Sequence, residues 1–305
     1  MRRVLYRIGV LPRETIGIPV VIVGNITAGG SGKTPLVLWI AKHLASQGWR
    51  PGIVSRGYGG RVSTLREAPV EVNAASDPAL VGDEPLLLAR RSAVPVWVGA
   101  DRLAACRGLR THHPECDVLV LDDGLQHYRL ARDVEIAVVD SRGFGNGYLF
   151  PAGPLREPVS RLRSVDAVVC NGEPGVGGYR MRLEGSRFVR LTDTGRGVEA
   201  AALGATRVHA VAGIGDPARF FSHLGALGLE VVPHPFPDHH AFSAADLAFG
   251  DGLPVVMTEK DAVKCWRFAQ PHFWMLPVDA ELDPAFGVRI AGKLGTRNPG
   301  GPQAA

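Results

Sequence analysis

Residues 20–34 read VVIVGNITAGGSGKT, an apolar run that leads into a glycine-rich turn and then into Gly-Lys-Thr. The next residues, 35–47, carry leucine, isoleucine and alanine at the spacing of one helix face. A strand, a glycine-rich loop and a helix in this order are typical of a phosphate-binding loop, because backbone N–H groups at the helix start can cradle phosphate oxygens. The candidate phosphate-binding residues are Thr27, Ala28, Gly29, Gly30, Ser31, Gly32, Lys33 and Thr34.

Lys33 and Thr34 have separate expected roles in this loop. Lys33 would place a positive charge against the β- and γ-phosphates, and Thr34 would supply a hydroxyl ligand for Mg²⁺. One position departs from the general pattern, since Thr27 stands where a glycine is usual, five residues before Gly32. The alternative is a glycine-rich turn with an incidental Lys-Thr pair, but the strand–loop–helix context favours nucleotide binding.

The surrounding sequence repeats the alternation of strand and helix. Short apolar runs without polar alternation, separated by helical segments, predict a parallel sheet covered on both faces. These runs are residues 20–23, 52–55, 118–121, 136–139 and 167–170. A second strand–helix series starts near Val208. We therefore expect an α/β fold of P-loop NTPase type, with a doubly wound, mostly parallel sheet and a second, smaller α/β domain.

The chain has 305 residues, more than one hydrophobic core usually absorbs, so we expect two domains. Residues 1–178 would form the first domain, with a short basic N-terminal segment. Residues 179–201 would form a linker, because 179–190 alternates apolar and charged residues as an exposed antiparallel ribbon does. Residues 202–295 would form the smaller domain, and residues 296–305, rich in glycine and proline, a disordered tail.

The composition excludes several classes of protein. Hydrophobic residues make up 46% of the chain and charged residues 21%, which is close to the globular average and excludes disordered and fibrous classes. No window approaches the ~20 apolar residues of a membrane-spanning helix. The formal net charge of +4 mildly favours an anionic partner but argues against nucleic acid. The four scattered cysteines argue against a zinc site or a disulfide scaffold.

A pair of acids follows one of the predicted strands. Asp122 and Asp123 come directly after residues 118–121, and Gln126 and His127 follow closely. Ligands of doubly wound sheets bind at the carboxyl edge, and a nucleotide site needs an acid there to hold the metal. Strand-end carboxylates can instead be solvated or cap the next helix. The pattern favours a metal site and leaves open which aspartate contacts Mg²⁺.

Seven short motifs occur in an order that resembles the tetraacyldisaccharide 4'-kinase family. They are GNITAGGSGKTP, SRGYGG, VGDEP, DDGLQH, FPAGPLREP, PDHHAF and TEKDAVK, and the resemblance covers roughly residues 18–264. The resemblance implies Mg²⁺-dependent transfer of the ATP γ-phosphate to the 4'-hydroxyl of a tetraacylated glucosamine disaccharide 1-phosphate. The product would be lipid IVA, an intermediate of lipid A biosynthesis in Gram-negative bacteria.

The same resemblance implies roles for individual residues. Asp83 would accept the proton of the sugar hydroxyl, His239 would be its partner from the other domain, and Lys33 would be the third catalytic residue. Asp122, Asp123, Glu157 and Thr34 would be the candidate metal ligands. The remaining expected active-site residues are Asn25, Arg56, Gln126, His127 and Arg156.

Structural explanations exist for several of these residues. Asp83 and Glu84 precede Pro85 and could cap a helix and charge its first turn. His239 is followed by a second histidine, and such pairs are commonly solvated loop residues. Arg56 follows a strand within SRGYGG and could bind a substrate phosphate or simply belong to a turn.

The N-terminus suggests how the chain meets its lipid substrate. Arg2, Arg3, Arg7 and Arg13 interleave with apolar residues, with no acid before Glu14. An apolar stripe edged by arginine suits an anionic lipid surface, whereas a frayed leader is a comparable alternative. We expect a monomer that lies peripherally at the cytoplasmic face of the inner membrane.

Two other functions share the strand–loop–helix beginning. One is a nucleotide switch such as a metal-insertion chaperone, although no cysteine lies near the loop. The other is an ATP-dependent ligase acting on a small carboxylate. Labelled ATP would separate these from a lipid kinase by the fate of the γ-phosphate.

Overall fold

The computed structural model describes residues 2–173 and 178–295, so the tail predicted to be disordered lies outside the described residues. The contacts of the chain divide it into two units. The first contains residues 1–183 and 280–305, and the second contains Glu184–Asp279. No helix of the described residues is long and apolar enough to cross a membrane.

The first unit is built on a nine-stranded sheet with the order β15-β8-β7-β6-β1-β5-β2-β4-β3. From β8 to β4 each strand pairs parallel with the next, and β3 pairs antiparallel with β4. The prediction of a mostly parallel sheet is therefore confirmed. The strands are β1 (Val20–Gly24), β2 (Pro51–Ser55), β3 (Val70–Val72), β4 (Val96–Val98), β5 (Val118–Leu121), β6 (Val134–Asp140), β7 (Ala167–Asn171), β8 (Tyr179–Glu184) and β15 (Asp279–Leu282).

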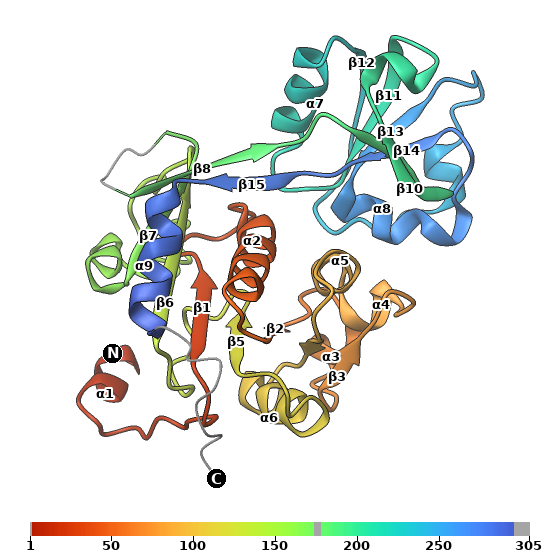
Figure 1. The fold of residues 1–305 in the computed structure, drawn as a ribbon. Coiled ribbons are helices and arrows are strands. Elements are labelled where there is room, and N and C mark those ends of the chain that lie inside the picture. The colour runs from red at the N-terminus through yellow and green to blue at the C-terminus, as the bar shows by residue number, and fades with distance from the viewer. Residues whose placement is uncertain (1, 174–177, 296–305) are drawn as a thin grey trace. The chain divides into compact units, whose positions relative to one another are not determined.

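Helices lie against this sheet (Figure 1). Helix α2 buries Leu36, Ile40 and Leu44, as its helical spacing predicts. The central strands β1 and β5 are buried at every position. The carboxyl ends of both strands therefore lie inside the unit. The helices of this unit are α1 (Arg2–Arg7), α2 (Lys33–Ser46), α3 (Arg61–Thr64), α4 (Pro78–Val81), α5 (Asp83–Arg91), α6 (Arg102–His112), the 3-10 helix η1 (Val159–Ser164) and α9 (Pro284–Leu294).

The second unit has a six-stranded sheet with the order β10-β9-β14-β13-β11-β12. The strands from β14 to β12 are parallel, and β9 pairs antiparallel with β14 and β10. Its strands are β9 (Phe188–Arg190), β10 (Asp193–Val198), β11 (Arg207–Ala212), β12 (Glu230–Pro235), β13 (Val255–Thr258) and β14 (Phe273–Leu276). Its helices are η2 (Ala200–Leu203), α7 (Pro217–Ala226), η3 (Ala244–Leu247), α8 (Glu259–Cys265) and η4 (Trp266–Phe268).

The boundaries of the units differ from the predicted ones. The predicted linker 179–201 is divided, because β8 pairs with β7 of the first sheet whereas β9 and β10 belong to the second. The predicted smaller domain 202–295 loses its end, because α9 returns to the first unit. There the ring of Phe286 lies 5.5 Å from that of Trp39, and Lys293 pairs with Asp166 at 2.8 Å. Local periodicity could not show that the chain returns to its first sheet.

Candidate functional site

The phosphate-binding loop connects β1 to α2 at the carboxyl edge of the first sheet. Asn25, fully buried at the end of β1, donates from Nδ2 to the Gly29 carbonyl at 3.2 Å and accepts from Lys33 Nζ at 3.4 Å. Gly32 has φ 88°, a conformation that favours glycine. Among the described residues no side chain caps α2, so the N–H groups of its first turn face the loop. This arrangement is a site for an anion such as a nucleotide phosphate.

Segments distant in sequence brace this loop. Asn171, at the end of β7, donates from Nδ2 to the Ser31 carbonyl at 3.2 Å. A Cβ on Gly32 would lie 2.6 Å from the same amide nitrogen, so the position requires glycine. The Ala28 N–H donates to the Pro154 carbonyl at 2.8 Å. The sequence analysis missed Asn171, whose only signal was a polar residue at a strand end.

Lys33, Asp123 and Arg156 form a charged group at the loop. Lys33 Nζ lies 3.5 Å from Asp123 Oδ1, and Arg156 Nη1 donates to both Asp123 oxygens at 3.0 and 2.9 Å. Burial raises the pKa of Asp123, but Lys33 and Arg156 outweigh it and hold that pKa below its ordinary value. Asp123 therefore carries its charge into the site and positions both cations.

Asp122 is the buried carboxylate of the site. It follows β5, is 1% exposed, and accepts from Ser55 Oγ at 3.2 Å through Oδ2. Among the described residues no group donates a hydrogen bond to its buried Oδ1. Burial, and next the negative charge of Glu84, raise the pKa of Asp122 to about 7, although the charge of Lys33 opposes this. Oδ1 of Asp122 can therefore bind a cation without losing a hydrogen bond.

The residues of this edge fit Mg²⁺ better than a metal held entirely by protein. Within residues 2–173 and 178–295, no cluster of three or more His, Cys, Asp or Glu could hold a metal. Mg²⁺ does not need one, because it takes one or two carboxylates and completes its shell with water and nucleotide phosphates. The buried, unsatisfied Oδ1 of Asp122 is a suitable oxygen ligand for it.

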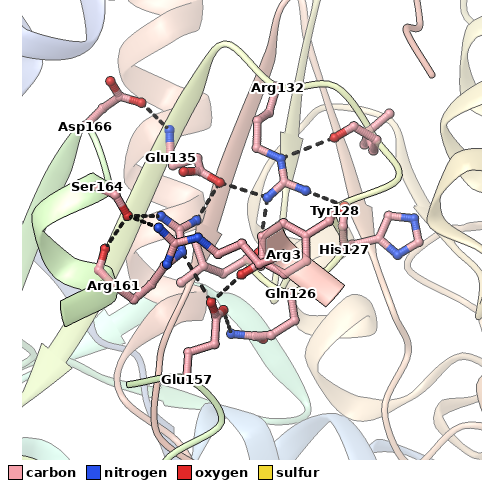
Figure 2. A network of polar contacts seen from close by, with 12 residues as sticks. Arg3, Gln126, His127, Tyr128, Arg132, Glu135, Glu157, Arg161, Ser164 and Asp166 are labelled. Carbon is pink, nitrogen blue, oxygen red and sulfur yellow. Dashed lines mark hydrogen bonds and ion pairs between the residues drawn. The ribbon is translucent and has the colours of Figure 1, made fainter. Parts of the chain in front are cut away.

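Glu157 is the centre of a hydrogen-bonded network (Figure 2). Its Oε1 accepts from Gln126 Nε2 at 2.8 Å, and its Oε2 accepts from the Tyr128 hydroxyl and lies 3.3 Å from Arg161 Nε. Arg161, which is 2% exposed, also donates to Glu135 at 2.6 Å. Because protein groups occupy both carboxylate oxygens, this geometry weighs against Glu157 as a metal ligand and favours a positioning role.

Gln126 connects this network to the phosphate-binding loop. Its Nε2 also donates to the backbone carbonyl of Asn25 at 3.0 Å. His127 accepts a hydrogen bond from Arg132 through its backbone carbonyl. Gln126 therefore holds the loop through an observed contact, whereas a role of His127 at the site stays a prediction.

Asp83 begins α5 and is 5% exposed. Its Oδ1 accepts from the Glu84 N–H at 2.9 Å, while the N-cap position belongs to Gly82, which has φ 91°. A Cβ on Gly60, in SRGYGG, would lie 2.5 Å from the Gly82 backbone nitrogen, so these two glycine-containing motifs pack directly together. Asp83 is thus a buried first-turn acid next to Glu84, whose charge acts on Asp122.

Arg102 is a buried cation that the sequence analysis missed. It is 6% exposed and donates to the Ala100 carbonyl at 2.9 Å. Burial, and next the charge of Arg56, lower its pKa to about 10, although Asp123 and Asp122 favour its charged form. Arg56, predicted as a site residue, therefore shares one electrostatic environment with Arg102 and the two aspartates.

His239 belongs to the second unit and lies beside Lys260. Lys260 Nζ lies 3.4 Å from His239 Nε2 and 3.2 Å from Asp238 Oδ1. His239 itself has φ 62°, which is unusual for a residue other than glycine. Asp83 belongs to the first unit, so the pairing of Asp83 with His239 stays a prediction.

Comparisons with known proteins identify the family of this chain. The family model for tetraacyldisaccharide-1-P 4'-kinase matches residues 1–295. A tetraacyldisaccharide 4'-kinase from Azoarcus sp. (strain BH72) is 53% identical over 301 residues, covering 96% of this chain and 87% of the relative. One from Nitrosococcus oceani is 50% identical, covering 96% and 86%.

A solved structure is similar over almost the whole chain. It is LpxK from Aquifex aeolicus, crystallised with ATP, and it has a TM-score of 0.80 and 28% sequence identity to this chain. The alignment covers 96% of this chain and 94% of that one. Both sequence and structure thus match over almost the whole chain. The chain belongs to the tetraacyldisaccharide-1-phosphate 4'-kinase family.

Proposed function

We propose that this chain transfers the γ-phosphate of ATP to the 4'-hydroxyl of a tetraacylated glucosamine disaccharide 1-phosphate, which gives lipid IVA. The observation that carries this proposal is a braced phosphate-binding loop beside Asp122 and Asp123, in a chain that matches the kinase family over residues 1–295. ATP binding is supported by the similar structure crystallised with ATP. Neither a metal-insertion switch nor a ligase gains support from these comparisons.

The loop and its cations would neutralise and orient the phosphates. Phosphoryl transfer depends mainly on positioning and charge stabilisation, because the transferred group carries its charge on peripheral oxygens. Lys33 lies within reach of Asn25 and Asp123, which aim its ammonium group at the loop. Arg156, held by Asp123, would contribute a second positive charge.

Thr34 and Asp122 would hold Mg²⁺, with Asp123 as the alternative carboxylate. We favour Asp122, because Asp123 is already paired with Lys33 and Arg156 whereas Oδ1 of Asp122 is unsatisfied among the described residues. The bound ion would supply positive charge to the β- and γ-phosphate oxygens. Glu157 would act by holding Gln126 and Tyr128 in place.

Asp83 would orient the acceptor hydroxyl and receive its proton. An aspartate is a weak base in water, with an ordinary pKa of about 3.9, but a loose transition state releases the proton late. Asp83 is buried at the start of α5, next to Glu84, whose charge acts on Asp122. His239, as the family resemblance implies, would stabilise the carboxylate.

The substrate implies where the protein works. We place it peripherally at the cytoplasmic face of the inner membrane, as a monomer. The arginine-rich N-terminus, which includes the exposed Arg13, would contact anionic headgroups.

The fate of labelled phosphate tests the proposal. The protein is incubated with Mg²⁺, γ-labelled ATP and the lipid disaccharide 1-phosphate in detergent. We expect label on the lipid with the wild type, and a loss of transfer with ATP affinity retained in Asp83→Ala. Label found only as inorganic phosphate contradicts a lipid kinase, and a normal rate in Asp83→Ala contradicts the proposed base.

A further inference from the structure

A loop beside the phosphate-binding loop exposes three consecutive apolar side chains. We define the aromatic loop as residues 143–155, with the sequence GFGNGYLFPAGPL. At its tip the side chains of Tyr148, Leu149 and Phe150 are 65%, 48% and 76% exposed. Single exposed apolar residues are ordinary, but a contiguous run that includes two aromatic rings marks an interaction surface.

Internal hydrogen bonds fix the conformation of the aromatic loop. The Phe150 N–H donates to the Leu155 carbonyl at 2.7 Å, and the Leu155 N–H donates to the Tyr148 carbonyl at 3.1 Å. The side chain of Asn146 donates to the Ala152 carbonyl at 2.9 Å and accepts from the Tyr148 N–H at 3.1 Å. The loop therefore presents its apolar tip on a backbone that is already organised.

Both arms of the aromatic loop are attached to the phosphate-binding loop. After the tip, the Pro154 carbonyl accepts from the Ala28 N–H at 2.8 Å, and the Arg156 N–H donates to the Ile26 carbonyl at 2.7 Å. Before the tip, the guanidinium of Arg142 donates to the Gly30 carbonyl. Whatever binds the tip is consequently held close to the nucleotide phosphates.

The charges around the tip indicate the kind of partner. Residues 143–155 contain no charged residue, and an arginine follows or precedes them at each end. Arg156 is assigned to the nucleotide phosphates, whereas the side chain of Arg142 is 41% exposed and pairs with Asp140. Aromatic and leucine side chains flanked by arginine suit the border of a bilayer, where rings meet acyl chains and guanidinium groups meet anionic headgroups.

We propose that the aromatic loop inserts Tyr148, Leu149 and Phe150 into the border of an anionic phospholipid bilayer and so holds the phosphate-binding loop at the membrane surface. This inference rests on the proposed function, because the acceptor hydroxyl of a lipid-borne sugar lies at that surface. It assigns membrane contact to the catalytic edge itself, in addition to the N-terminal segment.

Flotation with vesicles of phosphatidylethanolamine and phosphatidylglycerol tests this proposal without ATP or disaccharide. The double variant Leu149→Ser/Phe150→Ser is expected to lower the vesicle partition coefficient roughly tenfold or more, because two apolar side chains no longer leave water. Val288→Ser is the matched control, since Val288 is 75% exposed on α9. Unchanged flotation of the double variant, or an equal loss in the control, overturns the proposal.

The assay separates this proposal from the proposed kinase activity, since flotation needs no phosphoryl transfer. Wild-type thermal unfolding and ATP affinity in the double variant are expected and would show that the fold and the nucleotide site are intact. If the variant floats normally but no longer phosphorylates detergent-dispersed disaccharide, the tip binds the acyl chains of the substrate and the bilayer proposal is wrong.

A tryptophan introduced at the tip reports directly, through its fluorescence, whether the tip enters the bilayer. In Phe150→Trp, brominated phospholipid is expected to quench fluorescence beyond the level of the wild type, which has five tryptophans. Leu65→Trp is the control, because Leu65 is 63% exposed in the same unit. Equal quenching of both variants would show that the tip does not enter the bilayer.

Discussion

Each of the two units contains a buried aspartate, and the two aspartates differ in the partners of their carboxylate oxygens. Asp122, in the first unit, accepts one hydrogen bond, from Ser55, and its Oδ1 has no donor among the described residues. Asp261, in the second, is 0% exposed and accepts at Oδ2 from the Gly213 N–H at 2.9 Å and from Thr258 Oγ1 at 2.6 Å. Its Oδ1 also has no hydrogen-bond donor among the described residues, but it lies 2.7 Å from the ammonium group of Lys264.

This difference separates structural charge from functional charge. A buried carboxylate with hydrogen bonds to one oxygen and an ion pair at the other holds elements together, here the β13–α8 turn and the loop after β11. A buried carboxylate with an oxygen that has neither a hydrogen bond nor an ion pair, as in Asp122, destabilises the free protein and is tolerated where a ligand completes it. The comparison predicts that removing a charged group beside Asp122 lowers activity, whereas removing one beside Asp261 lowers the free energy of unfolding.

The lysines beside the two aspartates should show the largest contrast in activity. Lys33→Met is expected to lower lipid phosphorylation on the order of 10³-fold, because a fixed positive charge at the phosphates is lost. Its free energy of unfolding should change less than that of Lys264→Met, because Asp123, which lies 3.5 Å from Lys33, keeps its ion pair with Arg156. Steady-state kinetics and urea unfolding of one preparation measure both. Normal turnover would contradict the role of Lys33.

Lys264→Met should affect stability instead. Lys264 is 9% exposed, so its removal leaves the charge of Asp261 buried without its ion pair, at a cost of roughly 3–5 kcal/mol. Urea unfolding monitored by tryptophan fluorescence should show this loss. The double variant Lys264→Met/Asp261→Leu serves as the control, since removing both charges should restore part of the stability. A Lys264→Met protein as stable as the wild type would contradict the structural role of the Asp261–Lys264 pair.

The pH dependence of stability should differ through Asp122. Its pKa is raised from 3.8 to about 7 by burial first and then by Glu84. Between these values the folded protein binds more protons than the unfolded chain, so this carboxyl makes stability fall as pH rises. Urea titrations with EDTA should therefore give a flatter profile for Asp122→Asn than for the wild type in this window. Superimposable slopes would disprove the shift.

The smallest expected effect is at Asn171. Asn171→Ala removes the hydrogen bond to the Ser31 carbonyl, a contribution of about 1 kcal/mol, so the KM for ATP should rise about fivefold. Asn73→Ala is a suitable control, because the side chain of Asn73 accepts from the Ala75 N–H in an exposed turn. An unchanged KM in Asn171→Ala would show that the hydrogen bond from Asn171 to the Ser31 carbonyl does not help the loop to bind ATP.

Local patterns were enough to predict the parts of the site that are continuous in sequence. The loop from Thr27 to Thr34 and the acids after β5 follow directly from a strand and its next residues. Contacts between distant segments could not be predicted in this way, and they account for Asn171 and Arg102. They also explain Glu157, whose motif gives no sign that Gln126, Tyr128 and Arg161 occupy its oxygens.

The boundaries of the units were unpredictable for the same reason. Helix α9 has an ordinary amphipathic pattern, and nothing in it shows that Phe286 packs on Trp39, more than two hundred residues earlier. The mostly parallel sheet was predictable because buried parallel strands read as apolar runs. Sequence therefore specifies elements and adjacent functional groups, whereas the pairing of remote elements depends on tertiary packing.

The rate of lipid phosphorylation by Asp122→Asn at saturating Mg²⁺ tests the central claim most directly. The account predicts a rate on the order of 10³-fold below that of the wild type, since an amide cannot supply the anionic oxygen. It also predicts unfolding stability equal to or above that of the wild type, because a buried unsatisfied charge is gone. A variant with the wild-type rate, or one that is inactive because it no longer folds, would contradict the claim.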